Sequence, residues 1–181
     1  MSVANIDNLA SVDVAAYVRQ RSDPTPGDEF YLHLSDLSVA LRSHASTDPV
    51  RILDFGCGGS PYRSLFPNAT YQCADLKALS PADFEIDEDS RVNAPSAAFD
   101  LVLSTQVLEH CANPSNYLCE ARRVLRPGGK ILLTTHGTWE DHGCPFDFIR
   151  WTADGLEREL THAGFEVQTC QKLTTSGRAI A

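Results

Sequence analysis

Beyond residue 50, short apolar runs alternate with segments in which apolar residues recur every three or four positions. The short runs are typical of buried strands, and the longer spacing is typical of amphipathic helices. The pattern predicts strands over residues 50–55, 69–74, 84–86, 99–104 and 130–135. Strands that alternate with helices in this way predict an α/β fold built on a mostly parallel sheet.

Two of the predicted helices have recognisable ends. Asn113 is a favourable N-cap for the first, and the run Pro127-Gly128-Gly129 ends it. Thr152 is a favourable N-cap for the second, and Gly164 lies just beyond its last turn. Both helices follow predicted strands, as the βα alternation requires.

The first fifty residues have a different pattern. One helix is predicted there by apolar residues that share a face, Phe30, Leu34, Leu37 and Leu41, and a weaker helix pattern covers residues 12–19. We therefore divide the chain into an N-terminal helical segment, residues 1–46, and a domain of residues 47–181. The segment is expected to cover the sheet, and a lid over the functional site is the alternative or additional role.

Composition narrows the classes of partner. The chain has 181 residues, a single-domain length, and 15 Lys and Arg against 24 Asp and Glu give a formal net charge of −9. So acidic a chain is a poor candidate for binding the phosphate backbone, and no nucleic-acid partner is expected. No apolar run is long enough to cross a bilayer, and the first residues lack the pattern of a secretion signal. We expect a cytoplasmic protein without a membrane partner.

The clearest chemical signal is a glycine-rich turn after the first strand, Asp54-Phe55-Gly56-Cys57-Gly58-Gly59. Glycines let the backbone approach a ligand closely, and Ser60 and Pro61 are suited to begin a helix whose N-terminus faces it. Asp75 ends the next strand about 20 residues after Asp54, the offset at which an acid binds a ribose. The third glycine of the nicotinamide fingerprint is missing, so a nucleoside without a pyrophosphate fits better.

These segments resemble class I S-adenosylmethionine-dependent methyltransferases. The glycine-rich turn is similar to their D-x-G-C-G-x signature, and Asp75 holds the place of their ribose-binding acid. Residues 99–110 resemble their fourth-strand motif and residues 123–129 their motif before the fifth strand. The likeness is greatest to the ubiquinone/menaquinone-type small-molecule enzymes (type 11), one bacterial branch of which has a segment similar to residues 145–152. The resemblance implies a Rossmann-like three-layer α/β/α sandwich that transfers a methyl group from S-adenosyl-L-methionine to a small-molecule acceptor by in-line displacement.

The resemblance also implies a layout for the cofactor. Its contacts would come from Asp54, Gly56, Cys57, Gly58, Asp75, Leu76, Asp87, Gln106 and Val107. Gly56 and Gly58 would face the methionine part, Asp75 the ribose hydroxyls, and the Gln106-Val107 pair the sulfonium. Asp87 is the first choice for the adenine amino group. Glu88 and Asp89 compete for that contact, and a solvated acidic turn is the simpler explanation of all three.

Two histidines are candidates for catalysis. His110 follows the fourth strand and His136 follows the fifth, so both should lie at the carboxyl ends of strands, where open α/β sheets bind ligands. An imidazole with an ordinary pKa of about 6.5 can accept the proton of a hydroxyl acceptor near neutral pH. An architectural role is the alternative for each, and it is the simpler one for His110.

The irregular polar and aromatic segment over residues 136–145 is expected to shape the acceptor site. Candidate lining residues are Trp139, His142 and Trp151. Arg150 could bind a carboxylate or phosphate of the acceptor, or it could pair with Asp147 within the loop. The set His136, Glu140 and His142 matches no metal motif, and the six cysteines include no C-x-x-C pair, so no metal is expected.

The carboxyl-terminal end departs from the family pattern. Residues 165–170 alternate like a strand, but only residues 171–181 follow, so the antiparallel hairpin that ends the family sheet looks incomplete. An uncovered fifth-strand edge invites pairing, so we expect a partner chain, a swapped strand or a flexible end to cover it. A homodimer through that edge is the form that a partner chain would take. The same departure supports an alternative function, a catalytically silent methyltransferase-like binding or scaffold protein.

Overall fold

A parallel five-stranded sheet forms the centre of the chain. The computed structural model describes residues 13–76, 82–143 and 146–173. The strands are β1 (Arg51–Phe55), β2 (Thr70–Leu76), β3 (Phe84–Ile86), β4 (Phe99–Thr105) and β5 (Leu125–Thr134). Their order is β3-β2-β1-β4-β5, with every neighbouring pair parallel. The order therefore reverses between β1 and β4, and such a switch point is where open α/β sheets bind ligands.

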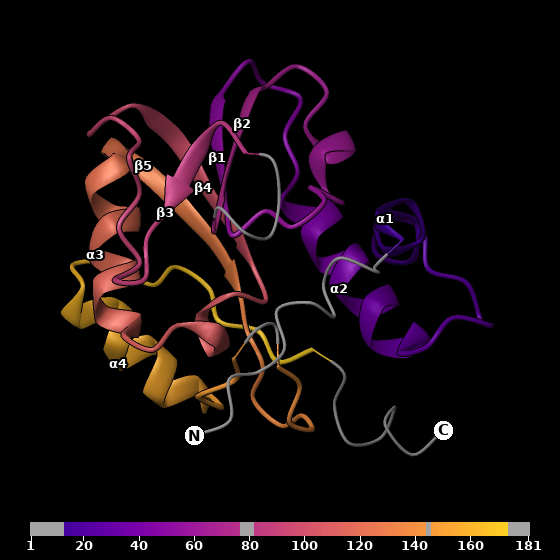
Figure 1. Cartoon of the computed structure of the whole chain (residues 1–181). Coiled ribbons are helices and arrows are strands. Elements are labelled where there is room, and N and C mark those ends of the chain that lie inside the picture. Colours follow the sequence, from indigo (N-terminus) through magenta and orange to yellow (C-terminus); the bar gives the residue numbers. More distant parts are fainter. Residues whose placement is uncertain (1–12, 77–81, 144–145, 174–181) are drawn as a thin grey trace.

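Helices cover both faces of the sheet (Figure 1). One face carries α1 (Val14–Ser22) and α2 (Tyr31–His44), and the other carries α3 (Pro114–Val124) and α4 (Ala153–His162). Two short 3-10 turns, η2 (Arg63–Leu65) and η3 (Leu108–His110), follow β1 and β4. The three-layer α/β/α sandwich expected from the sequence is confirmed.

On the α3 face, a buried tyrosine joins the helix to the sheet. Tyr117 of α3 stacks on Phe55 of β1, with ring centroids 4.2 Å apart. Its hydroxyl donates a hydrogen bond to the Phe55 carbonyl at 2.7 Å and lies 2.8 Å from the Ser104 hydroxyl. The predicted N-cap is present, since the Asn113 side chain accepts from the backbone N–H of Asn116. The helix is thus fixed against the ends of β1 and β4, next to the switch point.

On the other face, α2 packs into the sheet core. Leu37 and Leu41 are buried against Ile52 of β1 and Leu103 of β4. The predicted apolar face therefore does cover the sheet. Phe30 departs from it, because it lies before the helix in a left-handed conformation (φ 59°) with its side chain partly in solvent. The division of the chain at residue 46 stays a prediction.

The predicted helix after the glycine-rich turn is wrong. Ser60 has a left-handed backbone (φ 52°), and its hydroxyl lies 3.1 Å from the Cys73 sulfur instead of capping a helix. Only the 3-10 turn η2 follows, beginning at Arg63. A residue at positive φ with an engaged side chain cannot act as an N-cap, which needs extended backbone and a free oxygen.

The predicted strand over residues 165–170 is also wrong. The described residues after α4 contain no strand. Phe165 donates its N–H to the carbonyl of Leu160 at the end of α4, and Phe165 and Val167 pack against the core beneath the helix. The alternating pattern thus reflects side chains that pack without backbone pairing. In the described part of the chain β5 pairs only with β4, and residues 174–181 lie outside it.

The described residues bear on two features noted in the sequence, the absence of a membrane-spanning run and the scattered cysteines. Within residues 13–76, 82–143 and 146–173, no helix combines the length and the apolar character that crossing a membrane requires. The five described cysteines are free: Cys57, Cys73 and Cys111 are buried, and Cys119 and Cys170 are exposed. Cys144 lies outside the described residues.

Candidate functional site

The glycine-rich turn after β1 is built around two residues with positive φ. Gly56 has φ +83° and Gly58 has φ +50°, values that favour glycine. The N–H groups of Gly56 and Cys57 both donate to the carbonyl of Ala74 in β2, at 2.8 and 3.1 Å. A Cβ at Gly56 would lie 2.6 Å from a methyl of Val107. The turn is therefore tied to β2 on one side and packed against the residue after β4 on the other.

Asp75 lies against this turn, at the end of β2. One carboxylate oxygen accepts the N–H of Gly58 at 2.7 Å, and the other accepts the N–H of Leu76 at 2.8 Å. The Cys57 thiol is 3.6 Å from the same carboxylate. Burial raises the pKa of Asp75, while the two backbone N–H groups act in the opposite direction. Each oxygen can accept a further hydrogen bond, so the carboxylate can still bind a ligand.

Asp54 lies deeper, within β1. Its side chain is buried, and it accepts a hydrogen bond of 2.7 Å from the hydroxyl of Tyr71 in β2. Burial raises the pKa of Asp54 to about 7. The structure thus gives Asp54 a partner inside the protein, and its contact with a cofactor stays a prediction.

Helix α1 covers the outer side of the turn. A Cβ at Gly58 would lie 3.3 Å from the Tyr17 hydroxyl, and one at Gly59 would lie 2.8 Å from a methyl of Val18. The N-terminal segment therefore contacts the candidate binding turn directly, in addition to covering the sheet. The role of this segment as a lid stays a prediction.

Two consecutive residues after β4 join the turn to a second group of side chains. Val107 packs on Gly56, and Gln106, which has φ 56°, places its amide nitrogen 2.5 Å from Nε2 of His33 in α2. The backbone N–H of Gln106 donates to Thr134 at the end of β5. The turn and the side chains around His33 thus lie on opposite sides of one dipeptide.

His33 belongs to a set of rings in contact, here called the ring cluster, made of Phe30, His33, His136 and Trp139. The ring of His136 stacks on Trp139 with centroids 4.9 Å apart, and His33 lies 4.5 Å from Trp139. The rings come from the start of α2 and from the loop after β5. Sequence reasoning missed His33, although it lies one helical turn after Phe30.

The histidines of the ring cluster are neutral at ordinary pH. Burial, with a smaller contribution from Arg21, lowers the pKa of His33 to about 4, although Asp36 acts in the opposite direction. Burial, with smaller contributions from neighbouring His and Arg side chains, lowers the pKa of His136 to about 3. A neutral imidazole has one nitrogen that can accept a hydrogen bond, a proton or a metal ion. The cluster is therefore apolar on its ring faces and offers acceptor nitrogens at its edges.

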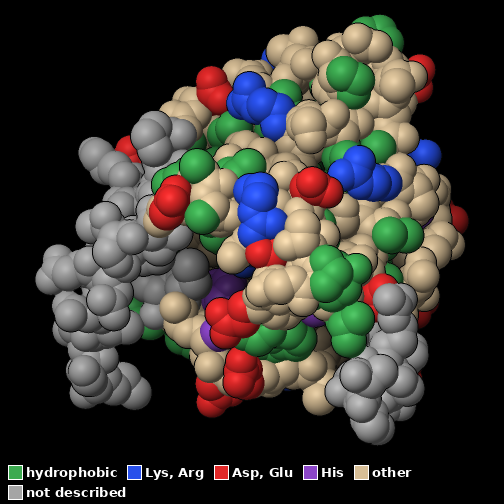
Figure 2. Space-filling view, turned by 90° about the vertical axis from the view of Figure 1, so that its right-hand side faces the viewer, with side chains coloured by type: hydrophobic (Ala, Val, Ile, Leu, Met, Phe, Trp, Pro, Cys, Tyr) green, Lys and Arg blue, Asp and Glu red, His purple; other side chains and the backbone are tan. Residues whose placement is uncertain are grey.

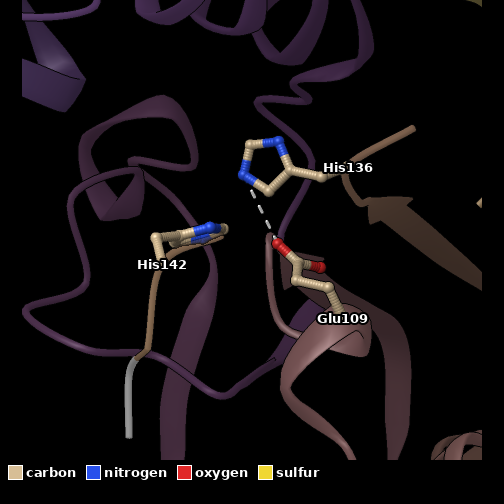
Figure 3. Close-up of side chains that lie close together, drawn as sticks. All are labelled: Glu109, His136 and His142. Atoms are coloured by element: carbon tan, nitrogen blue, oxygen red, sulfur yellow. Dashed lines mark ion pairs between the residues drawn. The ribbon is translucent and has the colours of Figure 1, made fainter. Parts of the chain in front are cut away.

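A buried acid lies beside the ring cluster. Glu109 of η3 is fully buried, and one of its carboxylate oxygens, Oε2, accepts the Thr135 hydroxyl at 2.6 Å. The other, Oε1, lies 3.5 Å from Nε2 of His136, and the His142 ring stands edge-on to His136 (Figure 3). Sequence reasoning placed Glu109 in a motif but gave it no role. The signal was its position between Leu108 and His110 at the end of a core strand.

A family model described as a methyltransferase domain matches residues 23–169. The chain belongs to the S-adenosylmethionine-dependent methyltransferases of class I. A ubiquinone biosynthesis O-methyltransferase of Maricaulis maris is 31% identical over 111 residues, which are 52% of this chain and 44% of that protein. The chain thus spans less than half the length of this curated relative.

Solved structures share the fold of this methyltransferase-family chain. A SAM-dependent methyltransferase from Aquifex aeolicus has a TM-score of 0.63 at 17% identity, with 90% of this chain and 94% of that one covered. The [4+2]-cyclase SpnF has a TM-score of 0.61 at 23% identity, with 92% of this chain and 72% of that one covered. A fold shared with a cyclase does not by itself fix the reaction, which must be argued from the site.

Within the methyltransferase fold, Asp87 closes a turn after β3. Its exposed carboxylate accepts the N–H groups of Asp89 and Arg91, at 3.0 and 2.8 Å. This is the solvated acidic turn given above as the simpler explanation. The contact with adenine, by Asp87 or by Glu88 or Asp89, stays a prediction.

His110 anchors a loop of this methyltransferase-family chain. Its Nδ1 lies 2.5 Å from the carbonyl oxygen of Phe146, and its ring meets the His142 ring edge to face at 5.0 Å. Burial lowers the pKa of His110. These contacts favour the architectural role, and its part in catalysis is not tested.

Arg150 and Trp151 hold the same loop to the fold. Arg150 makes two bonds of 2.5 Å to the Asp147 carboxylate and one of 2.7 Å to the Glu140 carbonyl. The pairing of Arg150 with Asp147, one of the two alternatives from the sequence, is thus present. Trp151 donates its backbone N–H to the His136 carbonyl, and its side chain packs against the core. Their contacts with an acceptor stay predictions.

The face of the molecule drawn in Figure 2 has a recess. Figure 2 shows histidine side chains within it, with acidic side chains beside them. The chain's net charge of −9 is consistent with acidic surroundings. A polyanionic acceptor is therefore disfavoured at this face.

Proposed function

We propose that the chain binds S-adenosyl-L-methionine at the glycine-rich turn and transfers its methyl group to a small-molecule acceptor held against the ring cluster. One observation carries the proposal: Val107 packs on the turn, and Gln106, the residue before it, contacts His33 of the ring cluster. A cofactor on one side of this dipeptide and an acceptor on the other would lie within reach of each other. Membership of the methyltransferase family supports the same assignment.

The residues at the turn fit an adenosyl cofactor. Gly56 and Gly58 adopt positive φ and let Val107 and Tyr17 pack closely on the turn, which fixes the backbone that would face the cofactor. Asp75 is held rigidly by Gly58 and Leu76 and retains acceptor capacity for the two ribose hydroxyls. Because it is buried, any hydrogen bond that it makes to a ligand is little weakened by competing water.

The chain's own contribution to the reaction is alignment and the exclusion of water. When bound, S-adenosylmethionine supplies a methyl group that is already activated by a sulfonium. Gln106 and Val107 would hold the reacting atoms between the turn and the ring cluster, while Tyr17 of α1 covers the turn. Correct orientation of two reactants can lower a barrier by about 7–11 kcal/mol in well-aligned cases, so no covalent intermediate is required.

We further propose that the attacking atom is a hydroxyl oxygen. The flat faces of Trp139 and Phe30 suit an apolar, ring-shaped acceptor. Because its pKa is lowered to about 3, His136 is too weak a base to keep the hydroxyl proton, so it would accept that proton and pass it on to solvent as the O–CH₃ bond forms. The relative from Maricaulis maris carries the name O-methyltransferase, which points the same way. A cytoplasmic location and a homodimer through the β5 edge also stay proposals.

Calorimetry and turnover assays test this function. S-adenosylhomocysteine should bind with one molecule per chain and NAD should not. Asp75→Ala should weaken the affinity at least tenfold, because the ribose contact and the anchor of the turn are both lost. Glu166→Gln, an exposed acid in the segment after α4, is the control and should have no effect. Undiminished affinity in Asp75→Ala would contradict the proposal.

The acceptor is sought with a panel of phenols, catechols and quinols, with methylated product detected by mass spectrometry. Turnover of a hydroxyl compound supports an O-methyltransferase. Cofactor binding without turnover of any member of a wide panel favours the catalytically silent binding protein instead. Light scattering of the same sample reports the dimer.

A further inference from the structure

We propose that Glu109, His136 and His142 form a binding site for a divalent transition-metal ion. Each residue offers one ligand atom, and the three atoms lie within 4.8 Å of one another. Figure 3 shows the three side chains converging from separate segments. Glu109 comes from η3 after β4, and the two histidines come from the loop after β5, so the parallel sheet itself brings them together at the carboxyl ends of neighbouring strands.

The Glu109 carboxylate is the strongest reason to place a cation here. It is fully buried, and Oε2 accepts the Thr135 hydroxyl, but none of the described residues donates a hydrogen bond to Oε1. Nε2 of His136 lies 3.5 Å from Oε1 and Nε2 of His110 lies 3.9 Å from it, both too far for a good hydrogen bond. A buried carboxylate oxygen without a donor is costly, and a bound cation would satisfy it.

The two histidines are held as metal ligands usually are. His136 stacks on Trp139, which fixes its ring with Nε2 toward Glu109. Nδ1 of His142 lies 3.4 Å from the Asp147 carboxylate and 3.2 Å from the Glu140 carbonyl, which leaves Nε2 as the donor for an ion. A carboxylate behind a ligating histidine orients the ring and raises its basicity, and Asp147 is itself fixed by Arg150.

The donor set selects the class of ion. Two imidazoles with one carboxylate suit zinc and similar transition metals, whereas magnesium and calcium prefer oxygen ligands throughout. Zinc bonds of about 2.0–2.2 Å put neighbouring ligand atoms roughly 3–4 Å apart, so these side chains need to close by only about 1 Å. Three protein ligands leave a fourth position open, as in catalytic zinc sites.

This site differs from the one considered from the sequence. The side chain of Glu140 is exposed, and its backbone carbonyl, not its carboxylate, contacts Arg150 and His142. The acid that joins the two histidines is Glu109, 27 positions before His136 along the chain. Local spacing could not reveal a site whose members meet only through the pairing of β4 with β5.

His136 belongs both to this site and to the ring cluster, so an acceptor on the rings would lie next to the ion. An ion in the site would hold the acceptor's hydroxyl oxygen at its open position and lower the pKa of that hydroxyl, so that its proton passes to water. The oxygen would then bond to the methyl carbon as the methyl–sulfur bond breaks and S-adenosylhomocysteine leaves. His136 then serves as a ligand instead of a proton acceptor. This use of the ion rests on the proposed function, whereas the binding of the ion does not.

Titration calorimetry on the chelator-stripped full chain tests the site, with zinc chloride and magnesium chloride as probes. The background carries Cys119→Ser and Cys170→Ser, which remove the two exposed thiols. We expect one zinc ion per chain and no binding of magnesium. Glu109→Gln, which keeps an acceptor for Thr135, and His142→Gln should each weaken zinc binding at least tenfold. His162→Gln, on the exposed side of α4, should leave it unchanged.

Absence of a one-to-one zinc complex, or equal zinc affinity in the parent, Glu109→Gln and His142→Gln, would overturn the proposal. Circular dichroism shows whether each variant is folded. Cobalt provides a second readout, because thiolate ligands give an intense near-ultraviolet band that a site of two histidines and a glutamate lacks. If the parent chain binds S-adenosylhomocysteine but no zinc, the metal site is rejected and the proposed function is not. If it binds zinc but transfers no methyl group, the proposed function is rejected and the metal site is not.

Discussion

Val107 packs so closely on Gly56 that a methyl group in place of a glycine hydrogen would lie 2.6 Å from the Val107 side chain. Gly56 also has φ +83°, so two separate effects oppose any side chain at this position. Gly128 allows the two effects to be told apart, because it has a similar φ of +77° but open space where a Cβ would lie. The pair allows backbone strain and crowding to be measured independently.

Gly56→Ala is expected to lower the free energy of unfolding by about 3 kcal/mol, the sum of left-handed strain and overpacking. Gly128→Ala should lose only about 1 kcal/mol, from strain alone. Urea denaturation of both variants measures the difference. Adding Val107→Ala to Gly56→Ala should recover the crowding part and not the strain. Equal losses in the two single variants would show that Val107 yields without cost.

The buried Asp54 predicts a specific dependence of stability on pH. Burial raises its pKa in the folded state to about 7, above the ordinary value of 3.8. The folded protein therefore binds this proton more tightly than the unfolded chain, and the stabilisation present below pH 4 is lost as pH rises towards 7.

Asp54→Asn removes this titration while keeping an acceptor for the Tyr71 hydroxyl. Between pH 5 and pH 8, the free energy of unfolding of the parent should fall by about 2 kcal/mol relative to the variant. Urea denaturation of both proteins across that range is the measurement. Parallel pH profiles would mean that Asp54 titrates normally in the folded protein.

The role of His136 can be separated from cofactor binding. Replacing His136 with Gln should lower turnover of a hydroxyl acceptor about 100-fold, since a proton acceptor or a metal ligand is lost. The affinity for S-adenosylhomocysteine should not change, because the described contacts of the His136 side chain are with Glu109, Trp139 and other histidines and not with the turn. His44→Gln, at the exposed end of α2, is the control. Unchanged turnover would remove His136 from the mechanism.

Phe30 provides a test of the acceptor site alone. Its ring lies 5.2 Å from Trp139 and its side chain is 45% exposed, so truncation should not unfold the protein. Phe30→Ala should raise the KM for an aromatic acceptor several-fold and leave cofactor affinity unchanged. Val39→Ala removes a more exposed apolar side chain from the same helix and should alter neither. An equal KM for the acceptor in both variants would place its binding elsewhere.

The sequence predicted the architecture because its signals are local. Asn113 and Thr152 cap the helices that were expected, and β3 has the predicted bounds, Phe84–Ile86. The same local reasoning failed at Ser60, where a left-handed backbone replaces a helix start. It also failed at Phe165, where the alternating apolar pattern comes from side chains that pack on the core without strand pairing.

The candidate site was predicted in part for a related reason. Asp75 and Gly58 are near each other because β1 and β2 are adjacent, which motif spacing can reveal. The contacts of His33 with Gln106 and of Glu109 with His136 join segments far apart in the sequence. No periodicity records such contacts, since they depend on how α2 and the loop after β5 lie on the finished sheet.

Helix α2 has a structural role along most of its length and a place in the ring cluster at its beginning. Leu37 and Leu41 in its later turns are locked into the sheet, while Phe30 and His33 at its beginning stand beside Trp139. Replacements at these first positions can therefore retune which compounds are accepted without disturbing the folded scaffold. Diversification of substrate preference among related chains would be expected to concentrate at this one helical turn.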